Sequence, residues 1–280
     1  MKRSEERDSL RSEEREASSE KQAESDSASR SSLLVSSSSF LVPRFSLPRR
    51  LVAESLGTAF LLATVVGSGI MGERLSGGNV AIALLANALA TSAILYVLIE
   101  WFGPISGAHF NPIVTLALAA RGDIGWRLVP AYVLCQIGAA IAGAGIANLM
   151  FDLPVYSWSH HARTGAAQYL SEAVATFGLL GLIWSASRMR PKSVSSLVAA
   201  YIGAAYWFTA STSFANPAVT MARALTDSFS GIRPVDVSGF ITAQLVGGVI
   251  AIAVFGWLLP GESADTQKRV ERSEEREARA

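Results

Sequence analysis

Hydrophobic residues gather in six long runs that polar links separate. The runs cover residues 51–71, 80–99, 128–150, 167–185, 194–208 and 235–259. A helix needs roughly 20 apolar residues to cross a bilayer, and every run except the fifth comes close to that length or exceeds it. We therefore predict an all-α membrane protein with six transmembrane helices, of which the fifth is the shortest.

Two Asn-Pro pairs each open a further, much shorter apolar stretch, at about 111–120 and 216–225. Asn is a favoured N-cap, and Pro suits the first helical position because its missing N–H would be unpaired there. Broken backbone inside hydrocarbon survives only where protein buries it or where it lines a watery cavity. Each pair therefore predicts a re-entrant loop that starts a half-helix, with the positive helix end pointing into a cavity.

The two halves of the hydrophobic region repeat each other. Glu54 in the first run matches Glu172 in the fourth, the two Asn-Pro stretches match, and Gln136 in the third run matches Gln244 in the sixth. Because each copy holds three spans, the second copy enters the membrane from the opposite side. Such an inverted repeat places a site at the interface of its halves, near the middle of the membrane.

Charged residues lie mostly in two end segments, 1–48 and 262–280, whose composition predicts disordered, solvated tails. The membrane domain then covers 49–261, with repeat one at 51–150 and repeat two at 166–260. Half of the 280 residues are hydrophobic and only 17% are charged, against about a quarter in a soluble domain. The net charge of +1 gives no reason to expect a nucleic-acid partner.

Neither a metal site nor an enzyme site stands out in the sequence. Cys135 is the single cysteine, which excludes an internal disulfide and a Cys-rich metal site. No Ser/His/Asp constellation appears, and the adjacent pair His160-His161 lies in a link, where such a pair is usually solvated. We expect no cofactor, no metal and no enzymatic activity.

Basic residues in the short links predict the orientation. On the side of the N-terminus lie Arg44, Arg49, Arg50, Arg121, Arg127, Arg188, Arg190 and Lys192, and on the other side lie Arg74, Arg163, Arg223 and Arg233. Eight basic residues against four predict that both termini are cytoplasmic and that the protein is a multi-pass protein of the cell membrane or an inner membrane.

Glycine is frequent inside the predicted spans. A residue without a Cβ lets two helices approach closely in a membrane, where small residues gather at helix interfaces. We expect close contacts at Gly57, Gly67, Gly69, Gly138, Gly143, Gly247 and Gly248.

The stretch Ser106-Gly-Ala-His-Phe-Asn-Pro112 and the triplet Asn216-Pro-Ala218 closely resemble the two signature motifs of the aquaporin family, also called major intrinsic proteins. Together with the repeated glutamate and the order of the spans, the resemblance covers about 50–261. It implies six spans, two re-entrant half-helices, and a homotetramer in the bilayer with one pore per subunit. It also implies passive passage of small neutral solutes.

The resemblance further implies roles for individual residues. Asn111 and Asn216 are expected to donate side-chain N–H groups to the solute at the pore centre, where two positive helix ends also oppose cations. Glu54 and Glu172 are expected to accept hydrogen bonds from the re-entrant loops, because an intramembrane carboxylate is costly without partners. The other motif positions are Pro112, Ile113, Pro217 and Ala218.

In the family, four positions form a selectivity filter beyond the Asn-Pro centre. Counted from the motifs, they fall on Thr91, Ala204, Ser213 and Val219. Water-selective members usually carry an aromatic, a His, a small residue and an Arg there, and glycerol-passing members keep an aromatic and the Arg. Here all four are small and Val219 replaces the Arg, so we expect a wide neck that resembles an aquaglyceroporin without the Arg. The expected solutes are glycerol, urea and neutral hydroxides such as arsenite or antimonite, with water as a further candidate.

Two residues, Arg223 and Ile113, can each be interpreted in two ways. Arg223 lies one turn beyond Val219 on the same half-helix. Either it reaches into an outer vestibule and replaces part of the missing charge, or it is a snorkelling interfacial arginine. Ile113 stands where the family has Ala, and either narrows the pore centre or packs away from it.

Two other classes of function also stay open. An ion-coupled secondary transporter can have inverted repeats and broken helices, but away from the ends of the runs the only carboxylates are Glu54 and Glu172, and Glu100 lies at the end of a run. A non-conducting membrane scaffold with this fold would suit a blocked neck, against which the small filter residues argue. We therefore expect a passive channel.

Overall fold

The computed structural model of this chain describes residues 45–259. Every element described below lies within these residues. The predicted tails, 1–48 and 262–280, lie almost entirely outside the described residues, and their assignment stays a prediction.

The described part of the chain is built from helices. In chain order these are α2 (Leu47–Leu75), α3 (Val80–Ser106), α4 (Pro112–Arg121), the 3-10 turn η1 (Trp126–Leu128), α5 (Val129–Met150), α6 (Ala166–Met189), the 3-10 turn η2 (Pro191–Ser193), α7 (Val194–Phe208), α8 (Pro217–Arg223) and α9 (Pro234–Leu258). Five of them are long and apolar enough to cross a membrane: α2, α3, α5 together with η1, α6 and α9. The predicted fold class, an all-α membrane protein, is confirmed.

The helix α7 is the exception among the six predicted spans. Its 15 residues give about 22 Å of helix, whereas the hydrocarbon core of a bilayer is about 30 Å thick. Its bounds agree with the predicted run 194–208, which is the shortest of the six. Because α7 is too short to span the bilayer, its position is fixed by its packing on α3 and α6.

The half-helices α4 and α8 begin at the prolines of the two Asn-Pro pairs. Gly122 ends α4 in a left-handed conformation with φ 90°, which a residue without a Cβ adopts readily. The helix α8 has seven residues, and it ends two residues before the predicted position because Ala224 and Leu225 turn back on it. Both helices are far too short to cross a bilayer.

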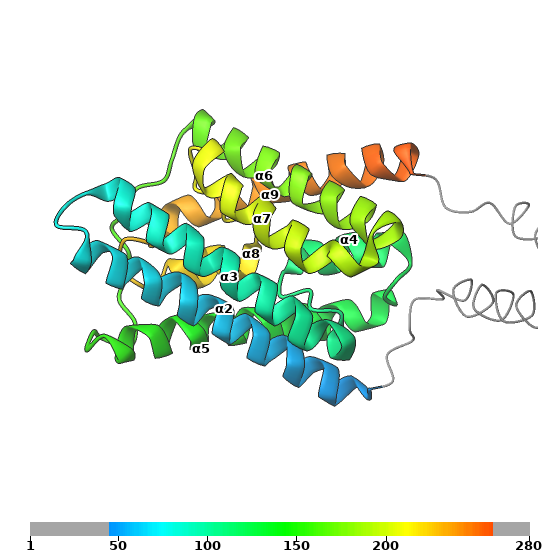
Figure 1. Cartoon of the computed structure of the whole chain (residues 1–280), viewed down its shortest axis with the longest axis horizontal. Helices are drawn as coiled ribbons and strands as arrows, with labels where there is room; N and C mark the ends of the chain where they lie inside the picture. Colours follow the sequence, from blue (N-terminus) through cyan, green and yellow to red (C-terminus); the bar gives the residue numbers. More distant parts are fainter. Residues whose placement is uncertain (1–44, 260–280) are drawn as a thin grey trace, which may run out of the picture. The chain divides into compact units, whose positions relative to one another are not determined.

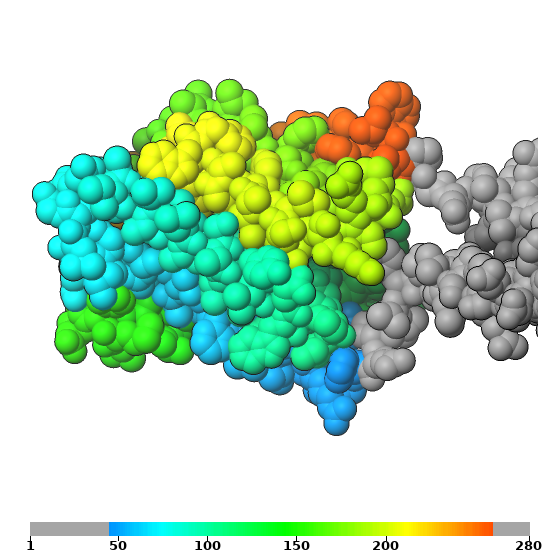
Figure 2. Space-filling model, in the orientation of Figure 1, coloured from blue at the N-terminus to red at the C-terminus, as the bar shows by residue number. Residues whose placement is uncertain are grey.

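Helix contacts repeat between the two halves. In the first half α2 packs on α3 and α5, and in the second α6 packs on α7 and α9. Figure 1 shows that α2 and α6 run in opposite directions, as an inverted repeat requires. The halves join where α3 lies beside α7, which the surface view in Figure 2 also shows.

The half-helices interlock the two repeats. The helix α8 packs on α5, and α4 packs on α9, so each half-helix contacts the last long helix of the other repeat. The ends of the described chain, at residues 45 and 259, lie at one end of the helical unit, and the link 151–165 between α5 and α6 lies at the other (Figure 1).

Candidate functional site

Both asparagines cap the half-helices that follow them. Asn111 Oδ1 accepts a hydrogen bond from Ile113 N at 3.0 Å. Asn216 Oδ1 accepts hydrogen bonds from Ala218 N at 3.0 Å and from Val219 N at 3.3 Å. Capping occupies the side-chain oxygen of each asparagine and leaves the amide nitrogen for other contacts.

The amide nitrogens tie the two motifs together. Asn111 Nδ2 donates to Ala215 O at 2.8 Å, and Asn216 Nδ2 donates to Phe110 O at 2.9 Å. An amide nitrogen carries two N–H groups, so each asparagine keeps one that these bonds do not use. Both asparagines line the central cavity, where the remaining N–H can meet a solute.

Glu54 is fully buried in α2 and holds the first re-entrant loop. Its carboxylate accepts hydrogen bonds from His109 N at 2.9 Å and Phe110 N at 2.8 Å. Ser106 Oγ donates to it at 2.7 Å and Gln136 Nε2 at 2.9 Å. Four donors around one carboxylate offset the loss of water that burial causes.

Glu172 repeats this arrangement in the second half. Its carboxylate accepts hydrogen bonds from Phe214 N at 2.8 Å, Ala215 N at 2.9 Å and Gln244 Nε2 at 2.6 Å. Gln244 also donates to Thr220 Oγ1 at 2.9 Å. The two glutamates therefore hold the two loops through successive backbone N–H groups.

Both loops contain non-glycine residues with positive φ, at matching positions. Ala108 and Phe110 have φ of 49° and 48°, and Ser213 and Ala215 have φ of 52° and 45°. These residues stand three and one positions before each asparagine. Positive φ is uncommon outside glycine, and it persists where surrounding contacts over-determine it. The hydrogen bonds to Glu54 and Glu172 supply those contacts.

The two asparagines line a cavity of about 120 Å³. Aliphatic side chains from α2, α3, α4, α6 and α7 make most of its wall. Its polar side chains are Thr91, His109, Asn111, Tyr206, Ser213, Asn216 and Arg223. Among the described residues no carboxylate lines this cavity. Such a wall suits a neutral solute with several hydroxyl groups better than a cation.

Three of the four predicted filter residues, Thr91, Ser213 and Val219, line the cavity. Ala204 does not, and its assignment is wrong: it is exposed on α7, while Tyr206 is buried and lines the cavity. Two residues along a helix turn the side chain by about 200°, so Ala204 and Tyr206 lie on opposite faces of α7, and Tyr206 is the one that faces the cavity.

Tyr206 changes the expected character of the neck. Its hydroxyl lies 3.1 Å from Thr91 Oγ1, and the two share a hydrogen bond. Ser213 Oγ is buried and has no hydrogen-bond partner among the described residues. At these residues the cavity wall therefore carries one aromatic ring and one hydroxyl without a partner among the described residues, rather than four small side chains.

Ile113 packs away from the cavity. It does not belong to the cavity lining and joins a buried cluster with Val114, Leu180 and Ala251. A Cβ placed on Gly248 would lie 2.9 Å from its Cδ1. The glycine on α9 thus makes room for the larger side chain, which leaves the pore centre no narrower.

Arg223 is buried, with only 2% of its surface exposed, and it lines the cavity. Its Nε donates to Ser230 O, and its Cζ lies 3.4 Å from the centroid of the Phe214 ring. A snorkelling side chain would be exposed, so this alternative does not describe Arg223. We call the end of the cavity formed by Tyr206, Ser213 and Arg223 the arginine mouth.

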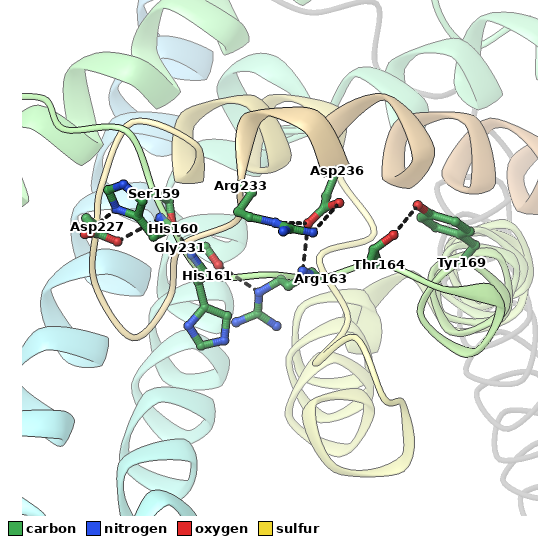
Figure 3. Close-up of polar contacts among 10 residues, drawn as sticks. All are labelled: Ser159, His160, His161, Arg163, Thr164, Tyr169, Asp227, Gly231, Arg233 and Asp236. Atoms are coloured by element: carbon green, nitrogen blue, oxygen red, sulfur yellow. Dashed lines mark hydrogen bonds and ion pairs between the residues drawn. The ribbon is translucent and has the colours of Figure 1, made fainter.

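The link 151–165, which we call the strap, is bonded to the loop that follows α8. Ser157 N donates to Leu225 O and Ser159 N to Ala224 O, both at 3.1 Å. His160 donates to Asp227 through its backbone N–H at 2.9 Å and pairs with it through its ring at 3.0 Å. Further along, Arg163 N donates to Asp236 Oδ2 at 2.8 Å. Figure 3 shows the contacts of His160 with Asp227 and of Arg163 with Asp236.

Arg163 and Tyr206 are functional candidates that the sequence reasoning missed. Tyr206 stands four residues after Ile202, so both share a face of α7, and both line the cavity; that spacing was the available signal. Arg163 lies in a link whose sequence has no periodicity, so the sequence showed only that it is one of the basic residues of that link. No local pattern connects it with Phe214, more than fifty residues later.

Comparison with known proteins identifies the relatives of this chain. Residues 42–213 match the family described as Major intrinsic protein. The aquaglyceroporin AqpS of Rhizobium meliloti (strain 1021) is 55% identical over 215 residues, which cover 77% of this chain and 92% of that protein. The chain belongs to the major intrinsic protein family. The aquaporin NIP6-1 of Arabidopsis thaliana is a more distant member, 27% identical over 81% of this chain and 74% of its own length.

A solved structure of the family has the same fold. The X-ray structure of the aquaglyceroporin from Plasmodium falciparum matches 75% of this chain and 96% of its own with a TM-score of 0.58, at 20% sequence identity. As a major intrinsic protein the chain is a passive membrane channel for small neutral solutes and not an enzyme. This agrees with the sequence prediction and disfavours the ion-coupled transporter and the non-conducting scaffold.

Proposed function

We propose that this protein is an aquaglyceroporin that passes glycerol, urea and neutral metalloid hydroxides such as arsenite and antimonite, with water alongside. The observation that carries the proposal is Val219, which lines the cavity where the family places an Arg. An aliphatic side chain there leaves width and removes a fixed donor and charge. The similarity to the aquaglyceroporin AqpS supports the same solute class.

We assign the following roles to the residues of the cavity and of the loops around it. Asn111 and Asn216 orient the solute at the centre with their unused N–H groups, and Glu54 and Glu172 hold the loops that present them. Thr91, Tyr206 and Ser213 offer hydroxyl groups at the neck. Arg223 restores part of the positive charge that Val219 lacks, since it lies one turn further along α8 and lines the same cavity.

We also infer a homotetramer in the cell membrane or an inner membrane, with both termini cytoplasmic. The ends of the described chain lie at one end of the helical unit (Figure 1), which is compatible with termini on one side. The excess of basic residues in the links on that side supports the cytoplasm. In this orientation the arginine mouth and the strap face outward.

The test is stopped-flow light scattering on reconstituted vesicles with water, glycerol and urea, together with uptake of radiolabelled arsenite. The parent protein is compared with Val219→Arg and with Val219→Leu, which adds bulk without charge. We expect fast solute entry in the parent, and a loss of about tenfold or more with Arg because the neck narrows and gains a hydrated charge. Water flow is expected to persist.

Two results contradict the proposal. A parent that passes water alone would show that the neck is not wide at Val219. A parent that passes no solute and no water would point to the non-conducting scaffold. A similar loss with Val219→Leu and Val219→Arg would assign the selectivity to width rather than to charge.

A further inference from the structure

Two arginines flank one aromatic ring at the arginine mouth. The Cζ atoms of Arg223 and Arg163 lie 3.4 Å and 5.0 Å from the centroid of the Phe214 ring. The two guanidinium carbons are therefore less than about 8.5 Å apart, the sum of these distances. Arg163 comes from the strap and Arg223 from α8, so the pair exists only in the folded protein.

Arg163 is anchored by neutral groups. Its Nε donates to Gly231 O at 2.8 Å, and its Nη1 donates to Ser211 O at 3.2 Å and to Thr212 Oγ1 at 3.4 Å. Only 7% of its surface is exposed. Ser211 and Thr212 directly precede Ser213 at the neck, so the guanidinium lies beside the entrance to the cavity.

No carboxylate forms an ion pair with either arginine within residues 45–259. The ion pairs found there are Arg121–Asp123, His160–Asp227 and Arg233–Asp236. Asp236 meets only the backbone N–H of Arg163 and pairs its charge with Arg233. Figure 3 shows the Arg163 guanidinium and the His161 ring on one side of the strap and the Arg233–Asp236 pair on the other.

The charge of Glu172 acts on both arginines, but its carboxylate bonds Phe214 N, Ala215 N and Gln244 Nε2 and forms no ion pair with either of them. Burial lowers the pKa of Arg163 to about 10, which still leaves the side chain protonated at neutral pH. Two positive charges therefore stand at the entrance, and a low-polarity wall strengthens their field.

We propose that Arg163 is a specificity-determining residue of this channel, which together with Arg223 places a double positive charge at the arginine mouth that rejects protons and other cations. This charge acts in place of the Arg that Val219 replaces. The inference rests on the proposed channel function, because it concerns which particles the same pore refuses. Arg163 acts through its field, since it lies beside the cavity lining and not in it.

The test compares proton and sodium permeability with glycerol permeability in the same reconstituted vesicles. Arg163→Gln removes the charge, and Arg163→Lys keeps it while losing the fixed geometry of the guanidinium. We expect the cation permeability of Arg163→Gln to rise about tenfold, the order of effect of one partly screened unit charge, with glycerol permeability changed little. Arg163→Lys is expected to remain close to the parent.

A second pair of variants leaves Arg163 in place. Thr212 has φ 61°, a conformation that Asp and Asn tolerate, and its Oγ1 already accepts from Arg163. Thr212→Asp would neutralise Arg163 with a carboxylate and should raise cation permeability, whereas the neutral Thr212→Asn should not. Arg74→Gln is the control for loss of an arginine elsewhere, because Arg74 also bonds a carbonyl and stacks on a ring, those of Phe151.

The possible results distinguish a failure of the role of Arg163 from a failure of the proposed channel function. Unchanged cation permeability in Arg163→Gln and in Thr212→Asp overturns the role of Arg163. Equal leaks in Arg163→Gln and Arg163→Lys overturn it too, because they would show that the guanidinium only braces the strap. A parent that passes no glycerol defeats the proposed function itself. A parent that passes glycerol, with variants that leak no cations, defeats only the inference about Arg163.

Discussion

Glu54 shows how much of this site depends on one side chain. It is fully buried, and its carboxylate accepts from two consecutive backbone N–H groups, those of His109 and Phe110. These donors belong to a loop with positive φ at Phe110, which would find other conformations without them. The position of Asn111, the next residue, therefore follows from a carboxylate on a different helix.

We predict that Glu54→Gln destabilises the protein by about 3 kcal/mol, because an amide has one acceptor oxygen and turns N–H donors toward the loop N–H groups. The melting temperature in detergent, followed by tryptophan fluorescence, measures this. Glu100→Gln is the control, since Glu100 is exposed at the end of its run and bonds only Ser195 in the described contacts. Equal melting temperatures for the two variants would contradict the loop-holding role.

At the scale of helices, glycines set how closely the long elements pack. A Cβ on Gly143 of α5 would lie 2.3 Å from Ala59 O of α2, and one on Gly247 of α9 would lie 2.2 Å from Ala173 O of α6. The equivalent helix pairs of the two repeats thus meet through a glycine against backbone. Gly138 differs, because nothing lies within 4 Å of its added Cβ, and the expected close contact there is wrong.

We predict that Gly143→Ala costs about 2 kcal/mol or more, since a backbone carbonyl cannot move aside cheaply in a packed interface. Gly138→Ala, in the same helix, should be neutral or slightly stabilising because Ala favours helix over Gly. Thermal unfolding of the two variants beside the parent checks this. A tolerated Gly143→Ala would mean that α2 and α5 can separate without loss.

At the scale of the whole molecule, the strap connects the two repeats and is bonded to the second. The carbonyl oxygen of His161, in the strap, accepts a hydrogen bond from Arg233 N at 2.9 Å. Burial, followed by the nearby charges of Arg163 and Arg223, lowers the pKa of His161 below its ordinary value of 6.5, and Asp227 opposes this only in part. The folded protein therefore prefers the neutral ring.

The sign of the resulting pH dependence is fixed. Because the folded pKa is below the unfolded one, His161 contributes its stability fully above pH 6.5 and loses it as the pH falls below that value. We predict that the melting temperature of the parent falls between neutral pH and about pH 5, and that His161→Gln reduces this fall. His160→Gln should not reduce it. An identical pH profile for parent and His161→Gln would refute the prediction.

The sequence alone determined the elements and their symmetry. Runs of apolar residues that are, with one exception, about long enough to span a bilayer, and Asn-Pro pairs that start helices, are local signals that burial in lipid makes decisive. The repeated Glu54 and Glu172, with Asn111 and Asn216, marked the matching loops for the same reason. Every one of these features depends on neighbours within a few turns of the same helix or on an internal repeat.

Only the tertiary structure decided which side chains reach the cavity. Tyr206 replaces Ala204 there because the face of α7 that turns inward is set by packing on α3 and α6, and a shift of two residues reverses the face. Arg163 reaches the mouth through an irregular strap whose path no periodicity encodes. Ile113 leaves the pore centre open because Gly248, on another helix, receives it. Selectivity thus depends on contacts between distant segments, which local sequence patterns do not specify.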